Sequence, residues 1–102
     1  MDIEQVKTTE DCDEVASMDT YDESEYIAGW CTCLTDVFDS VESCTHMGQK
    51  VQLIKISQQR NSIVAKISFR GEISYTTIDC LRVENLKQYQ KIWIKAYKQF
   101  LL

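Results

Sequence analysis

The sequence predicts a single α+β domain in which helices cover one face of a three-stranded antiparallel β-meander, giving two layers. Apolar residues recur at three- and four-residue steps over residues 20–46 and 84–101, which is typical of amphipathic helices. Residues 50–79 instead show alternation of apolar and polar side chains, interrupted by short polar turns, which is typical of strands. The chain has no proline and three glycines among 102 residues, so one domain over residues 1–102 is expected.

The first helical pattern is preceded by an acidic, weakly periodic segment, residues 1–19. Thr8 or Thr9 is a suitable N-cap for a short helix there, because the acids that follow suit a first helical turn. A mobile tail is the alternative, and we favour the short helix. Met18 is one of few aliphatic anchors in this segment.

The helix predicted over residues 20–46 begins at Thr20-Tyr21-Asp22-Glu23, which matches a capping box. Gly29 lies inside this helix and indicates a close packing contact, since glycine costs about 1 kcal/mol against alanine there. Gly48 is a natural stop. The apolar stripe consists of Ile27, Trp30, Cys31, Leu34, Val37, Phe38 and Val41.

Three strands are expected at 50–57, 63–69 and 73–78, joined by a polar hairpin loop at 58–62 and a tight turn at Arg70-Gly71-Glu72. In the last helix, 84–101, the lysines lie opposite the apolar stripe. They are Lys87, Lys91, Lys95 and Lys98.

Charge is distributed unevenly along the chain. Residues 1–48 carry thirteen acidic residues and one basic residue, Lys7, whereas residues 49–102 carry three acidic and ten basic residues. The two halves have net charges of −12 and +7, which together give the net −5 of the whole chain. This asymmetry is the most informative feature of the sequence for function.

No catalytic or metal centre is predicted, and no cofactor is expected. Cys31, Cys33, Cys44 and His46 have a spacing reminiscent of zinc ligands, but Cys31 and Cys33 would lie about 200° apart on one helix. The single histidine, His46, is expected at the end of that helix, where its charge suits the dipole. A small metal- or thiol-dependent enzyme built on these cysteines is the least favoured hypothesis.

The five cysteines are interpreted as free thiols, because their number is odd and the chain is not dense in cysteine. The N-terminus Met1-Asp2-Ile3-Glu4 is acidic and has no apolar segment after it. We therefore expect a cytoplasmic protein without a membrane partner, acting in the host-cell cytoplasm if it is phage-encoded.

The sequence also bears on direct nucleic-acid binding. The order helix, meander, helix resembles that of double-stranded-RNA-binding domains. Their lysine cluster at the start of the last helix is missing, because that stretch reads Arg82-Val83-Glu84-Asn85-Leu86. The first helix is acidic and would be repelled by phosphates, so this function is disfavoured.

The sequence therefore favours a non-enzymatic acidic inhibitor that occupies the basic groove of a nucleic-acid-handling protein, such as a phage anti-defence protein of the anti-CRISPR type. A toxin immunity protein and a self-assembling structural subunit, in which the acidic half of one copy meets the lysines of another, are the alternatives. The residues expected to bind the partner are Asp11, Asp13, Glu14, Asp19, Asp22, Glu23, Glu25, Asp36, Asp39 and Glu42.

Overall fold

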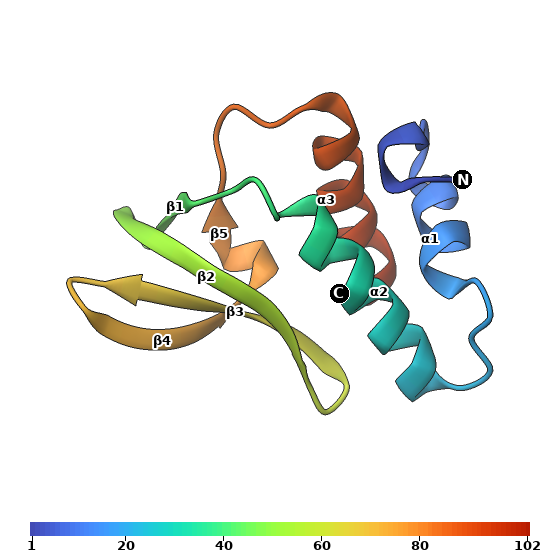
Figure 1. Cartoon of the computed structure of the whole chain (residues 1–102), viewed down its shortest axis with the longest axis horizontal. Helices are drawn as coiled ribbons and strands as arrows, with labels where there is room; N and C mark the ends of the chain where they lie inside the picture. Colours follow the sequence, from blue (N-terminus) through green and yellow to red (C-terminus); the bar gives the residue numbers. More distant parts are fainter.

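The computed structural model describes all residues, 1–102, and confirms the α+β class: three helices pack with a five-stranded antiparallel sheet (Figure 1). Two short 3₁₀ turns, η1 and η2, accompany them. In chain order the elements are η1 Ile3–Gln5, α1 Thr9–Ser17, α2 Glu23–Val37, β1 Ser43–His46, β2 Gln49–Gln59, β3 Ser62–Phe69, β4 Glu72–Thr77, η2 Ile78–Cys80, β5 Leu81–Arg82 and α3 Gln88–Leu101.

The predicted meander is present as β2, β3 and β4, and two strands that the sequence did not predict extend it. The sheet order is β4-β3-β2-β1-β5, with every neighbouring pair antiparallel. The predicted helix over 20–46 was wrong at its C-terminal end, because the last four of those residues form β1.

Two local features explain why the helix stops early. The Phe38 amide donates a helical hydrogen bond to the Leu34 carbonyl at 3.0 Å, and Phe38 is the C-cap of α2. The Val41 amide then donates to the Phe38 carbonyl, which closes a tight turn after the helix. A two-residue turn, Met47 and Gly48 with φ of 51° and 80°, pairs β1 with β2. Gly48 is therefore a hairpin residue rather than a helix stop, and His46 ends a strand.

The helix starts also differ from the expected positions. The N-cap of α2 is Asp22, two residues after the expected Thr20: Asp22 accepts from the Glu25 amide and Glu25 accepts from the Tyr21 amide, both at 2.8 Å. α3 begins at Gln88 because Asn85 adopts a left-handed φ of 59° and the backbone of Lys87 is extended. The short N-terminal helix is confirmed, with Thr8 as its N-cap.

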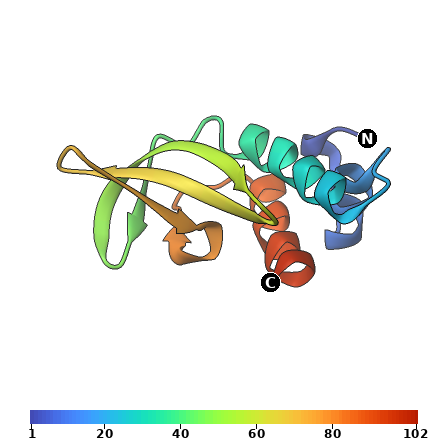
Figure 2. The same ribbon diagram turned by 90° about the horizontal axis from the view of Figure 1, so that it is seen from below.

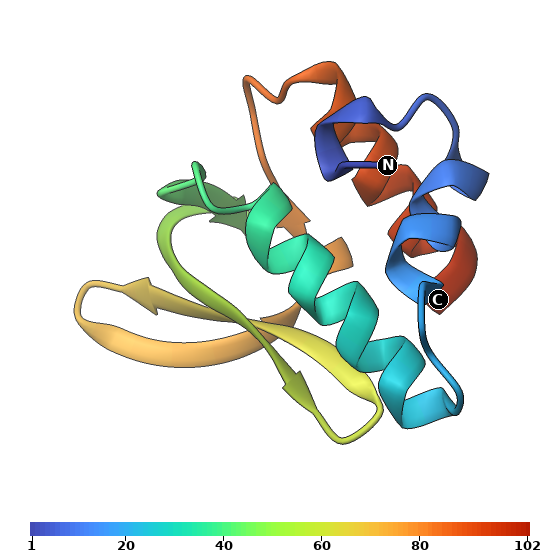
Figure 3. The same ribbon diagram turned by 45° about the vertical axis from the view of Figure 1, so that its right-hand side comes forward.

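The core lies where α2 and α3 meet each other and the sheet. Trp30 of α2 and Trp93 of α3 have no exposed surface, and their rings pack edge to face at 5.5 Å. Figure 3 shows α2 between the sheet and the α1–α3 pair, and Figure 2 shows the β3–β4 hairpin extending beyond the helices. The longest helix, α2, has fifteen residues, and none of the helices has the length and apolar character needed to cross a membrane.

A buried glutamine connects the two long helices. Gln90 is 3% exposed; its side-chain amide donates to the Val37 carbonyl at the end of α2, and its side-chain oxygen accepts from the Lys87 amide at the start of α3, both at 2.8 Å. It therefore satisfies one orphan backbone group at each of two helix ends.

Gly29→Ala is expected to destabilise the protein, because a Cβ at this position would overlap the backbone carbonyl oxygen of Ala16 in α1. The overpacking cost of about 1–3 kcal/mol exceeds the gain of about 1 kcal/mol in helix propensity. Urea denaturation measures the change in the free energy of unfolding, with the exposed Ser24→Ala in the same helix as control. A more stable Gly29→Ala variant would contradict the close contact.

Gln90→Leu is expected to lower the free energy of unfolding by about 2–4 kcal/mol, because it leaves two backbone groups without their partners. The matched control is Gln88→Leu, the same substitution at an exposed position of the same helix, which should change the free energy of unfolding by no more than about 0.5 kcal/mol. Equal effects from the two variants in thermal denaturation would show that the buried hydrogen bonds contribute little.

Candidate functional site

The most distinctive surface is the α1–α2 corner, defined here as Met18–Glu25. The side chain of Tyr21 is 87% exposed and that of Met18 is 59% exposed, although both are large apolar groups. The carboxylates that accompany them on this corner are all exposed, and they belong to Asp19, Asp22, Glu23 and Glu25. Tyrosine and methionine are enriched in protein-recognition surfaces, and the carboxylates around them add a negative field that attracts a basic partner.

Local hydrogen bonds hold the corner in one conformation. The amide and the hydroxyl of Thr20 both donate to the Ser17 carbonyl, at 3.1 and 2.7 Å. Asp19 adopts a left-handed φ of 61°, which aspartate tolerates better than most residues. Because Asp22 and Glu25 cap the next helix, the backbone around Tyr21 is tied on both sides. A surface ordered before binding loses less entropy when a partner docks.

Four of the ten predicted partner-binding carboxylates have structural roles. Asp22 and Glu25 cap α2 as described. Asp11 caps α1 by accepting from the amides of Lys7 and Thr8 at 2.9 and 3.2 Å, and the bond from Lys7 is the main cause of its lowered pKa. These carboxylates are needed for the helix ends whether or not a partner binds.

Asp13 is the fourth of these carboxylates, and it accepts a hydrogen bond from the hydroxyl of Tyr26. Burial, and then the hydrogen bond to Asp13, raise the pKa of Tyr26. The ring of Tyr26 in turn packs edge to face on Trp30 at 6.5 Å. Asp13 therefore joins α1 to α2, and it is less available to a partner than the carboxylates of the corner.

The remaining predicted carboxylates separate into two groups. Glu14, Asp19 and Glu23 are exposed at or near the corner, whereas Asp36, Asp39 and Glu42 lie at or beyond the other end of α2. The rise of an α-helix places Glu23 and Asp36 about 20 Å apart. After Glu25 the exposed positions of α2 before Asp36 carry no charge, and they are Ala28, Thr32 and Thr35. The second group is thus set apart from the corner along the length of α2.

The cysteines and the histidine do not assemble into a centre. Cys31 and Cys33 lie on α2, while Cys44 and His46 lie on β1, and no three side chains of the metal-ligating types come together. Burial raises the pKa of Cys31, Cys33 and Cys44, and it raises the pKa of Cys12 to about 12. These four thiols are held in the protonated, weakly nucleophilic form.

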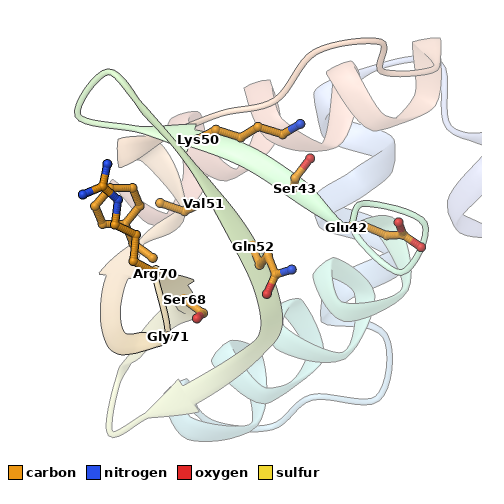
Figure 4. Close-up of a pocket in the computed structure, with 9 residues that line it drawn as sticks. Glu42, Ser43, Lys50, Val51, Gln52, Ser68, Arg70 and Gly71 are labelled. Carbon is orange, nitrogen blue, oxygen red and sulfur yellow. The ribbon is translucent and has the colours of Figure 1, made fainter.

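The largest hollow in the surface, about 520 Å³, lies beside the turn between β3 and β4 (Figure 4). Lys50 and Arg70 are its two cationic side chains, and Figure 4 shows them extending in different directions. The Arg70 guanidinium lies over the ring of Phe69, 5.1 Å from its centroid. The two cations therefore do not converge on one anionic ligand.

Sequence patterns identified part of the corner. Its carboxylates were predicted to bind a partner, and the position of Tyr21 beside the acidic run was visible in the sequence. Met18 was expected to anchor the N-terminal segment, and its exposure was not foreseen. Comparisons with protein-family models, curated proteins and solved structures give no match for this chain.

Proposed function

We propose that this protein is a non-enzymatic inhibitor that inserts the α1–α2 corner into the basic groove of a nucleic-acid-handling protein. The supporting observation is the exposure of Tyr21 and Met18 among four carboxylates. The corner belongs to a stretch, residues 8–42, that carries eleven acidic residues and no lysine or arginine. A groove that follows phosphates is positively charged and would attract this negatively charged part of the molecule.

The carboxylates and the apolar side chains have different roles in this proposal. The carboxylates steer the protein to a positive groove and raise the association rate, an effect that weakens as salt increases. Tyr21 and Met18 provide the desolvated contacts, since a few aromatic residues supply most of the energy of an interface. The corner protrudes at one end of α2 (Figure 1), which suits a concave partner.

Size and charge suit a phage protein that antagonises bacterial defence, such as an anti-CRISPR protein, and this protein would act in the cytoplasm of the host. A toxin immunity protein is the second candidate, because immunity proteins against nuclease toxins meet the same basic surface. The two differ in the partner, and they share the electrostatic mechanism.

Assembly of the acidic half of one copy on the lysines of another is less well supported. Lys7, Lys91 and Lys95 line one hollow beside the start of α1, and Glu10 lies in the same hollow. Lys91 and Lys95, which belong to the basic half, thus lie next to the acidic helix of their own chain. That proximity reduces the positive surface available to a second copy's corner.

Asp19→Lys/Glu23→Lys is expected to weaken partner binding by more than tenfold at low salt, and Tyr21→Ala by about 10- to 100-fold. None of the three residues caps a helix through its side chain, so both helices should keep their caps. Circular dichroism and thermal denaturation check that lysine is accepted at the left-handed φ of residue 19. Asp36→Lys/Asp39→Lys is the matched control, because it changes the charge equally at the far end of α2. Surface plasmon resonance at two salt concentrations measures the affinities, and equal losses from both double variants would exclude the corner as the binding site.

The partner itself is obtained by immobilising the protein and passing over it lysate of the host cell, with the Asp19→Lys/Glu23→Lys variant in parallel. We expect the wild type to retain a nucleic-acid-handling protein that the variant does not retain. Single-stranded DNA should elute this protein from the wild type at constant salt. A retained protein that nucleic acid fails to displace would contradict occupation of the groove, because the two ligands would then bind different surfaces.

A further inference from the structure

The strand β4 forms a free edge of the sheet. It pairs with β3 on one side, and no strand follows it on the other. At the opposite edge β5 has only two residues, so little unpaired backbone is exposed there. Figure 1 shows β4 on the side of the sheet away from α1. A free edge offers unpaired amides and carbonyls to another strand.

The turn before β4 determines which backbone groups face outward. Arg70 and Gly71 both have positive φ, 51° and 82°, and the turn joins Phe69 to its partner Glu72. In such a two-residue hairpin the closing pair exchanges both hydrogen bonds, and bonded and non-bonded pairs then alternate. The amides and carbonyls of Ile73, Tyr75 and Thr77 therefore point away from β3.

This edge lacks the features that normally protect an edge strand. The register of β3 with β4 is regular, without a bulge, and residues 73–77 contain neither proline nor a charge. Ile73 and Tyr75 are 51% and 52% exposed, and both lie on the outer face of the sheet with their side chains on the same side. The edge therefore combines free hydrogen-bonding groups with apolar side chains.

We infer that β4 pairs antiparallel with β4 of a second copy of this chain, in a register centred on Ser74. This register sets Ile73 opposite Tyr75 of the partner subunit twice, once on each side of the two-fold axis. Such aromatic and β-branched cross-strand pairs stabilise sheets. About four backbone hydrogen bonds form between outward-facing groups, and the two five-stranded sheets become continuous.

Self-complementarity and charge favour a second copy as the occupant. The register places Glu72 opposite Thr76 of the partner subunit, so that no like charges face each other along β4. The acidic stretch 8–42 includes α1 and α2, which lie on the helical side of the molecule (Figure 3). Pairing through β4, at the edge of the sheet, would therefore keep the acidic stretches of the two copies apart. Because the edge is short, the dimer is expected to be weak and to depend on protein concentration.

Two double variants test the pairing, Ile73→Lys/Tyr75→Lys and Ile73→Glu/Tyr75→Glu. Each sets like charges directly opposite one another across the two-fold axis, so each alone should stay at the 11.9 kDa monomer mass in analytical ultracentrifugation. An equimolar mixture should regain dimer, because lysine then faces glutamate. Wild type should approach twice the monomer mass as its concentration rises towards about 1 mM.

Two further variants test where the dimer forms. Ile54→Lys, at an isoleucine that is 46% exposed on β2, should leave the dimer intact. Ser74→Cys, in a Cys80→Ser background that removes the exposed thiol, should form an intermolecular disulfide under mild oxidation. A wild type that stays monomeric at every concentration, or a dimer that survives both charged double variants, would overturn the inference. Salt-sensitive oligomers larger than a dimer would instead indicate head-to-tail assembly of opposite charges.

Discussion

Two tryptophans without exposed surface, Trp30 in α2 and Trp93 in α3, meet edge to face at 5.5 Å, with their planes at 82°. Phe100 packs on the same indole of Trp30 at 6.2 Å, and the Trp93 indole nitrogen donates to the Ile3 carbonyl at 2.9 Å. Aromatic pairs of this geometry contribute about 0.5–1.5 kcal/mol beyond the area that they bury. The contact fixes α2 against α3 and holds the N-terminal segment in place.

The position of α2 separates the molecule into two ends with different chemistry. Its N-terminal end carries the α1–α2 corner, where Asp22 and Glu25 serve as caps. One side of α2 packs on the sheet, and the free edge of that sheet, β4, has almost no charge. A partner at the corner and a second copy at β4 would therefore not compete for the same surface.

Periodicity in the sequence was sufficient for the α+β class and the meander, because those segments keep one pattern over several residues. The helix α1 was predicted instead from a capping threonine followed by acidic residues. It failed at 43–46, where Ser43-Cys44-Thr45-His46 continues the helical spacing only by coincidence; pairing with β2 across the Met47-Gly48 turn decides its structure. The carboxylates of the candidate site were visible as an acidic run. Which of them cap helices, as Asp11 and Asp22 do, depends on helix starts that periodicity locates only within a few residues.

The bond between Ile3 and Trp93 joins residues ninety positions apart. Because α3 supplies Trp93 and part of the surface against which α1 packs, the N-terminal third of the chain cannot reach its final packing until residues 88–101 have been synthesised. The corner that we propose to bind a partner is consequently a late product of translation. Ribosome-bound intermediates would present the acidic segment before α1 has packed against α3.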